Sequence, residues 1–487
     1  MKKHLFWTGC LLALATGLAS AELNTLWTQT YGGSANDGAR DVIPTSDGGF
    51  LAVGYTNSFG DFGPDVYLVK TDVGGQVTWS RTYGGAGRDY GYAVCETSDG
   101  NFVFTGFTKS FGTGDMDVYL VKVDTDGNEI WSHTYGGAAE DEARGICEAS
   151  DGSLIITGRT QIAGTHDCNL YLIRTDAAGD SIWTRSFGGA EWDWGWSVCE
   201  LADGDYGVVG TTGSVSGNRD AYLLKVDPTG TAAWAAGLGS HHALDCDRGF
   251  SIIPLDDGGM VVAGFGNEHD TNEAAQVLLF RVAANGNVLL ETEYGEGLYY
   301  DYGLSVCRAH DGGYLIVGIT KDEAHQNDDL YLIKVDSGGR KEWTQIIGGH
   351  GADRAWKICE VSRGRYIIGG HTSSEGAGGF DFLLLHMIDP SAQTVDTPVA
   401  RATARLQRPQ APLRPGGSIH FSLTRSAHVQ LEMVNCLGRV VDTLLDGDRD
   451  AGEHAVTWTA EGRESGVYYC VLTVDGNSAR RKVVLLR

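Results

Sequence analysis

The fold is decided by the stretch from residue 91 to residue 135, which contains four short segments: GYAVCET (91–97), FVFTGFT (102–108), VYLVKVD (118–124) and IWSHTY (130–135). Each is rich in β-branched and aromatic residues, and Gly or Asp-Gly turns separate them, which is the pattern of consecutive antiparallel strands. Apolar residues fall on both faces of the middle segments, as in a sheet that is covered on both sides. The stretch therefore predicts a four-stranded sheet packed between two others.

The same pattern recurs about every 52 residues, at Trp27, Trp79, Trp131, Trp183, Trp234 and Trp343, with Leu290 in the sixth unit. Seven units are present, and stacked four-stranded units of 40 to 50 residues are typical of a β-propeller. A lone strand-like segment, residues 26–31, precedes the first unit, whereas the last unit ends at residues 383–388 without an outer strand. We therefore predict an all-β chain with a seven-bladed β-propeller, closed by pairing of the N-terminal strand with the last sheet.

The ends of the chain differ from the repeats. Residues 1–21 have the basic start, short apolar run and small-residue cleavage site of a signal peptide, so we expect export through the periplasm to the cell surface or the medium. No run of 18 or more apolar residues occurs, and we expect no membrane span. We assign residues 22–390 to the propeller, 391–410 to a linker, and 411–487 to a small immunoglobulin-like β-sandwich of about seven short strands.

Charge separates the two predicted domains and excludes one class of partner. The 487 residues include 70 Gly and carry a net charge of −26, and such a field repels phosphate backbones, so we expect no nucleic-acid partner. Residues 22–399 hold 54 Asp and Glu against 23 Lys and Arg, whereas residues 400–487 hold 9 against 12.

Half of the ten cysteines follow the repeat, at Cys95, Cys147, Cys199, Cys307 and Cys359. Equivalent atoms of neighbouring sheets lie roughly 10 Å apart, and a disulfide needs Cα atoms within about 7 Å. These positions therefore predict buried thiols rather than disulfides. Cys436 and Cys470 fall on two predicted strands of the last domain, where a disulfide and two free thiols are both open.

The last domain contains SIHFSL (418–423), LGRVV (437–441), AGEH (451–454), Trp458, SGVYY (465–469) and RKVVL (481–485). In this combination it resembles the type A C-terminal sorting domain of the bacterial type IX secretion system, a family that overlaps the flagellar hook-assembly immunoglobulin-like fold. The resemblance implies that the protein crosses an outer membrane, that the outer-membrane secretion machinery is its partner, and that the C-terminal domain is the signal for this secretion. The repeats themselves look like those of secreted bacterial propeller-repeat proteins.

Each unit carries an acid a few residues after its Gly-Gly or equivalent turn, at Asp37, Asp89, Asp141, Asp193, Asp247, Asp301 and Asp353. Propeller topology places these acids on one face near the mouth of the central channel. They either bind a ligand or cap their own turns through backbone N–H groups. Aromatic residues beside them suit the apolar faces of sugar rings, or pack between blades. The candidate ligand-binding residues are Asp89, Tyr90, Trp192, Asp193, Trp194, Tyr300, Asp301 and Asp353.

Three functions fit this pattern. The first is a secreted or cell-surface binding or adhesion protein that recognises a glycan or protein with its loop-rich face and has no catalysis of its own. The second is a carbohydrate-active hydrolase or lyase that uses an acid pair among Asp193, Asp247 and Asp301. The third is a structural surface protein. We expect no cofactor. We also expect no metal, because His241-His242 with Asp245 and Asp247, and His269-Asp270, lack a third nitrogen or thiolate at fixed spacing.

Overall fold

The structure is a computed structural model that describes residues 22–60, 63–214, 219–239, 247–266, 275–295, 300–321, 327–395, 404–406, 416–423, 427–434, 440–460, 462–463, 465–474 and 477–485. The chain divides into two compact units, Met1–Gln393 and Thr394–Arg487. In the described part of the first unit, strands form seven four-stranded antiparallel sheets, and the only helix is a 3-10 turn, η1 (Pro390–Val395). The propeller-like, nearly all-β architecture that the sequence predicts is confirmed.

The strands of the first unit fall into these sheets in chain order. Sheet 1 consists of β2 (Asp37–Pro44), β3 (Phe50–Thr56), β4 (Asp65–Thr71) and β5 (Val77–Tyr83). Sheet 2 consists of β6 (Asp89–Glu96), β7 (Phe102–Thr108), β8 (Asp117–Val123) and β9 (Glu129–Tyr135). Sheet 3 consists of β10 (Asp141–Glu148), β11 (Leu154–Gln161), β12 (Cys168–Thr175) and β13 (Ser181–Phe187). Sheet 4 consists of β14 (Asp193–Glu200), β15 (Tyr206–Thr212), β16 (Asp220–Val226) and β17 (Ala232–Leu238).

The remaining sheets follow the same order, except for the last. Sheet 5 consists of β18 (Arg248–Pro254), β19 (Met260–Gly266), β20 (Gln276–Val282) and β21 (Val288–Tyr294). Sheet 6 consists of β22 (Asp301–Arg308), β23 (Tyr314–Thr320), β24 (Asp329–Val335) and β25 (Lys341–Ile347). Sheet 7 consists of β26 (Asp353–Ser362), β27 (Arg365–Thr372) and β28 (Asp381–Ile388), with β1 (Asn24–Tyr31) as its outer strand.

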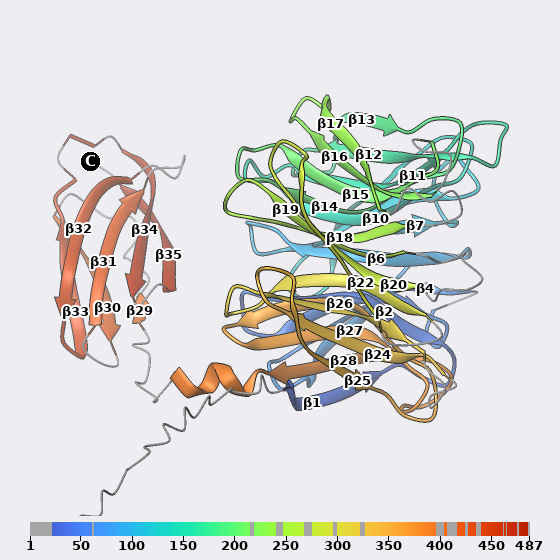
Figure 1. Ribbon diagram of the computed structural model, residues 1–487. Helices are drawn as coiled ribbons and strands as arrows, with labels where there is room; N and C mark the ends of the chain where they lie inside the picture. Colours follow the sequence, from blue (N-terminus) through green and yellow to red (C-terminus); the bar gives the residue numbers. More distant parts are fainter. Residues whose placement is uncertain are drawn as a thin grey trace, which may run out of the picture. The chain divides into compact units, whose positions relative to one another are not determined.

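The two ends of the first unit meet in sheet 7. Although β1 and β28 stand at opposite ends of the unit's sequence, they lie side by side (Figure 1), and they pair antiparallel from Asn24 opposite Ile388 to Tyr31 opposite Phe382. The first strand of each sheet contacts the first strand of the next, and β26 contacts β2. The predicted pairing of the N-terminal strand with the last sheet is confirmed, and the sheets close into a ring.

Two recurrent sequence features join neighbouring strands and sheets. The outer-strand tryptophan donates its indole N–H to a turn of the next sheet, as in the 2.9 Å bond from Trp79 Nε1 to the Thr125 carbonyl. The basic residue of the third strand pairs with the aspartate of the Asp-Gly turn, as in Lys122 Nζ to Asp99 Oδ2 at 2.7 Å. The third strands β4, β8, β16 and β24 are buried along their whole length, as sheets covered on both faces require.

Every sheet has a bulge at the same point between its first and second strands. The register shifts by one residue, so that the residue three positions after the start-of-strand aspartate has no partner on the second strand. A glycine on the second strand permits the close approach: a Cβ on Gly210 would lie 1.7 Å from the Trp194 carbonyl oxygen. The bulge turns an additional side chain toward the centre of the ring.

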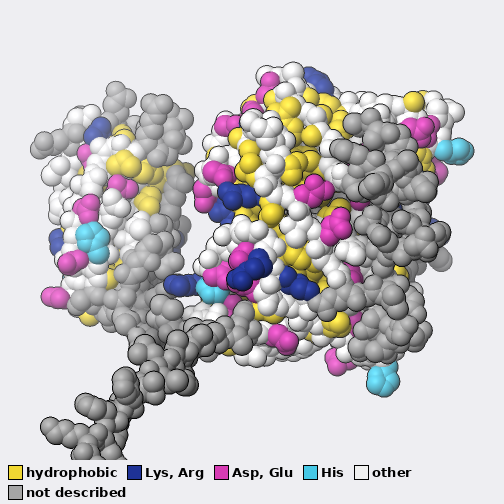
Figure 2. Space-filling model, in the orientation of Figure 1, with side chains coloured by type: hydrophobic (Ala, Val, Ile, Leu, Met, Phe, Trp, Pro, Cys, Tyr) yellow, Lys and Arg dark blue, Asp and Glu magenta, His cyan; other side chains and the backbone are white. Residues whose placement is uncertain are grey.

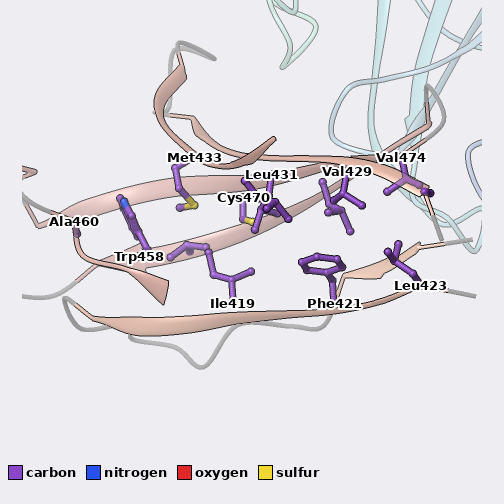
Figure 3. Packing of buried hydrophobic residues seen from close by; sticks show 14 of the residues in the cluster. Ile419, Phe421, Leu423, Val429, Leu431, Met433, Trp458, Ala460, Cys470 and Val474 are labelled. Carbon is purple, nitrogen blue, oxygen red and sulfur yellow. The ribbon is translucent and has the colours of Figure 1, made fainter. Parts of the chain in front are cut away.

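The second unit has two described sheets around its own apolar core. One contains β29 (Ala404–Leu406), β30 (Gly417–Leu423) and β33 (Gly452–Trp458), and the other contains β32 (Val440–Arg449), β31 (Ala427–Val434), β34 (Gly466–Val474) and β35 (Asn477–Leu485). Figure 3 shows Ile419 and Phe421 of the first sheet facing Val429 and Leu431 of the second. All residues of this core belong to the second unit.

Several predictions concern thiols, membrane spans or segments outside the described residues. Cys95, Cys147, Cys199, Cys307, Cys359 and Cys470 have free thiols, which confirms the absence of disulfides at the repeated position. Cys436 lies outside the described residues, as do the predicted signal peptide, most of the predicted linker, and His241, His242, Asp245, His269 and Asp270. Among the residues with a described conformation, no helix has the length and apolar character that crossing a membrane would require.

Candidate functional site

The repeated aspartates are buried in their own sheets. Asp193 is completely buried, and its Oδ2 accepts hydrogen bonds from the Gly189 N–H (2.9 Å) and the Ser214 hydroxyl (2.7 Å), while its Oδ1 accepts one from the Thr212 hydroxyl. The other candidate carboxylates, Asp89, Asp301 and Asp353, are at most 5% exposed and accept hydrogen bonds from the loops or second strands of their own sheets. This geometry agrees with the interpretation in which each aspartate caps its own turn. None of the four carboxylates lies at the surface.

Arginine and aromatic side chains lie next to these aspartates, on the first and second strands of the sheets. They come from three positions per sheet: the residue after the aspartate, its partner on the second strand, and the bulge residue. We call these side chains the arginine–aromatic belt: Arg40, Tyr55, Tyr90, Tyr92, Phe107, Glu142, Arg144, Arg159, Trp194, Trp196, Thr211, Arg248, Phe250, Phe265, Tyr302, Leu304, Ile319, Arg354, Trp356 and His371, with Gly38 completing the set. Five members are arginines and one, Glu142, is acidic.

Two tryptophans of the belt, Trp194 and Trp196, lie beside Trp192 of the loop that precedes sheet 4. The rings of Trp192 and Trp194 stack with their centres 6.0 Å apart and their planes 11° apart, and Trp196 lies 5.2 Å beyond Trp194. Trp192 is 38% exposed. A pocket of about 220 Å³ is lined by these three residues together with Thr211, Arg219 and Arg248.

Two arginines of sheet 3 lie against the rings of Trp194 and Trp196 in sheet 4. The Arg159 guanidinium carbon lies 4.8 Å from the centre of the Trp194 ring, and that of Arg144 lies 4.9 Å from Trp196. Both arginines donate hydrogen bonds to Oε1 of buried Glu142, at 3.0 Å and 2.9 Å. Burial alone would raise the pKa of Glu142, but the two arginines outweigh it and hold the pKa below its ordinary value. The three groups together therefore carry a net positive charge.

A second aromatic group lies on sheets 1, 2 and 7. Tyr90 stacks on Phe107 with ring centres 5.1 Å apart, and its ring centre is 4.8 Å from that of Tyr55. The Arg40 guanidinium carbon lies 4.3 Å from the Trp356 ring centre and 5.5 Å from Tyr55. Burial lowers the pKa of Arg40, and its Nε has no hydrogen-bond partner among the described residues.

Tyr300 lies beside the belt and contacts it through the ion pair of Asp328 and Arg354. Its hydroxyl donates to Oδ1 of Asp328, whose Oδ2 accepts a 2.7 Å hydrogen bond from Arg354 Nε. Burial raises the pKa of Tyr300, and Asp328 adds to the effect. Its ring stacks on Tyr302 with centres 4.8 Å apart. Tyr300 therefore presents a ring face, while its hydroxyl is occupied.

The candidate aromatic residues are connected rather than isolated. An unbroken series of ring contacts runs from Trp192 to Tyr300 through Trp194, Trp196, Phe250, Phe265 and Tyr302, across sheets 4, 5 and 6. Tyr90 lies apart from this series and meets it through Tyr92, whose ring centre is 3.8 Å from the guanidinium carbon of Arg144. The structure thus connects the candidate aromatic residues through ring contacts, whereas the candidate carboxylates are buried in their own sheets.

The arginines of the belt were missed by the sequence interpretation. Arg40 and Arg144 both stand three residues after a repeated aspartate, where other units have Tyr92, Trp196 or Trp356. That shared position, together with the recurrent glycine of the second strand, was the available signal for the bulge. Figure 2 shows acidic side chains scattered over the drawn face of the first unit with a few Lys and Arg among them, as the net charge of −26 leads one to expect. The belt departs from that background.

No known family model matches the chain. A segment is similar to the regulatory protein FlaEY of Caulobacter vibrioides, with 28% identity over 173 residues, which spans 30% of this chain but only 18% of FlaEY. The fold is similar to PorZ, an essential bacterial surface component of the type IX secretion system of Porphyromonas gingivalis, with 14% identity, a TM-score of 0.41, and coverage of 94% of this chain and 60% of PorZ. It is also similar to the periplasmic gluconolactonase PpgL of Pseudomonas aeruginosa, with 14% identity, a TM-score of 0.43, and coverage of 64% of this chain and 85% of PpgL. No activity follows from these similarities.

Proposed function

We propose that this chain is an exported glycan-binding protein, secreted or held at the cell surface, in which a seven-bladed propeller binds the ligand at the channel mouth. The observation that carries the proposal is the exposed Trp192 stacked on Trp194 beside a pocket of about 220 Å³. Flat aromatic faces match the C–H faces of sugar rings, while Thr211 and the arginines supply donors for hydroxyl edges. A concave site with aromatic walls and few polar groups is the usual form of a small-ligand site.

The same geometry favours binding over hydrolysis. A glycosidase needs two carboxyl groups that face the scissile bond, about 5 to 10 Å apart. Asp193 and Asp301 accept hydrogen bonds from their own sheets and are 0% and 5% exposed. The proposal therefore assigns them to the fold rather than to catalysis.

The second unit supports the proposed route of export. We propose that it is an immunoglobulin-like sorting domain, since two small sheets enclose a core that is entirely its own. Its residues also carry the motifs that resemble the type IX sorting domain, and its basic balance differs from that of the repeats.

A glycan array probed with the mature chain, residues 22–487, tests the proposed function. We expect retention on one or a few related glycans, and no release of reducing sugar when those glycans are incubated with the protein. Release of sugar would replace the proposal with a carbohydrate-active enzyme. A blank array, together with capture of a cell-surface protein, would replace it with protein recognition.

A further inference from the structure

The charge of the belt is opposite to the charge of the unit that carries it. Among its members, five arginines face a single acid, Glu142, whereas residues 22–399 as a whole hold 54 acidic against 23 basic residues. Salt bridges neutralise part of this charge: Glu142 pairs with Arg144 and Arg159, and Asp328 pairs with Arg354. A further arginine near the belt can bind an anionic ligand only if it does not already form an ion pair with an acid of the chain.

Arg219 meets that condition at the tryptophan pocket. Its side chain is exposed, its guanidinium carbon lies 5.5 Å from the Trp192 ring centre, and no ion pair of Arg219 occurs in the described part of the chain. Arg248 lines the same pocket, and its guanidinium carbon lies 5.7 Å from the Phe265 ring centre. Two guanidinium groups thus border the pocket that the three tryptophans line.

We infer that the pocket formed by Trp192, Trp194, Trp196, Arg219 and Arg248 binds an acidic sugar, with the ring on the tryptophans and its anionic substituent against Arg219. The inference rests on the proposed function and names its ligand class. A guanidinium donates two parallel hydrogen bonds to a carboxylate or sulfate, which gives it geometric specificity for these groups. The overall negative field repels extended polyanions, so a single sugar with one local anion is favoured over nucleic acid.

Matched pairs of oligosaccharides test the inference with the mature chain, residues 22–487. An oligosaccharide with one galacturonic acid residue and its methyl ester differ in a single carboxylate, and a monosulfated oligosaccharide and its desulfated form differ in a single sulfate. We expect the acidic member of at least one pair to bind about tenfold or more tightly at low salt, as a charge-assisted hydrogen bond predicts. The difference should shrink in 0.5 M NaCl because salt screens exposed charges.

One substitution and its control assign the effect to the pocket. Arg219→Gln should weaken binding of the acidic member about five- to tenfold and leave the neutral member unchanged. Arg185→Gln is the control, because Arg185 also lies 5.5 Å from a tryptophan ring, Trp183, but on the outer strand β13. It should change neither affinity.

Each other outcome has a defined meaning. Equal binding of the acidic and neutral members, with Arg219→Gln silent, would overturn the inference and leave glycan binding intact. Binding of neither member of any pair, on a blank array, would remove the proposed function itself. Acidic binding that Arg185→Gln weakens as much as Arg219→Gln, or that a single-stranded oligonucleotide matches, would show general attraction of anions and would also overturn the inference.

Discussion

Replacing Trp192 by Ala should weaken binding of the glycan at least about thirtyfold without changing the thermal stability of the protein. The indole is 38% exposed, stacks on Trp194 and lies beside Arg219, so its loss removes one wall of the pocket but little of the core. Truncation of an aromatic anchor at the centre of a binding site costs about 2 kcal/mol or more, which is the basis of this magnitude.

Isothermal titration of the wild type and the variant with the same oligosaccharide measures this effect. Ile182→Ala is the matched control, because Ile182 is 52% exposed on the outer strand β13 and lies outside the pocket. Unchanged affinity in Trp192→Ala, with an unchanged melting curve, would remove the tryptophan platform from the account.

Deleting residues 394–487 should abolish export past the outer membrane while the first unit stays folded. The core of the second unit contains only its own residues, so its removal takes no side chain from the ring of sheets. We expect the truncated protein to accumulate in the periplasm of its native host and to melt at the temperature of the first unit in the full chain.

Cell fractionation and calorimetry report these two properties separately. Normal secretion of the truncated protein would contradict the sorting role of the tail. A fall in the melting temperature of the first unit would contradict the independence of the two units.

The sequence was sufficient to predict the propeller-like set of four-stranded antiparallel sheets because its signals are periodic. Each unit repeats the alternation of strands and Asp-Gly turns, and the missing outer strand of the last unit pointed to its partner near the N-terminus. Pairing of Trp27 with His386 and of Tyr31 with Phe382 follows that expectation. Because the strand pattern is local and repeated seven times, a strand with a weak pattern in one unit can be assigned by comparison with the other units.

The site could be predicted only in part, for two physical reasons. The position of the aspartates was predicted at the channel mouth, but the hydroxyls that engage them come from residues 19 and 21 positions later, as in Thr212 and Ser214 for Asp193. A bulge changes which side chains face the channel, and a one-residue shift of register is not visible in a strand pattern. The sequence pattern therefore indicated ordinary strand residues at Arg40 and Arg144, whereas in the structure the bulges place both arginines in the belt.

The closed ring, on which the position of every belt residue depends, is tested most directly by removing β1. We expect a chain that begins at Gly32 to lose at least about 3 kcal/mol of stability, because β28 loses a strand of backbone hydrogen bonds and the Gly75 carbonyl loses the 2.7 Å hydrogen bond that it accepts from the Tyr31 hydroxyl. Amides of Phe382–Ile388 should then exchange with solvent much faster, whereas Leu26→Ala, at a 42% exposed position of the same strand, should change neither property. An unchanged melting temperature and unchanged amide exchange in the chain without β1 would contradict the closure of the ring.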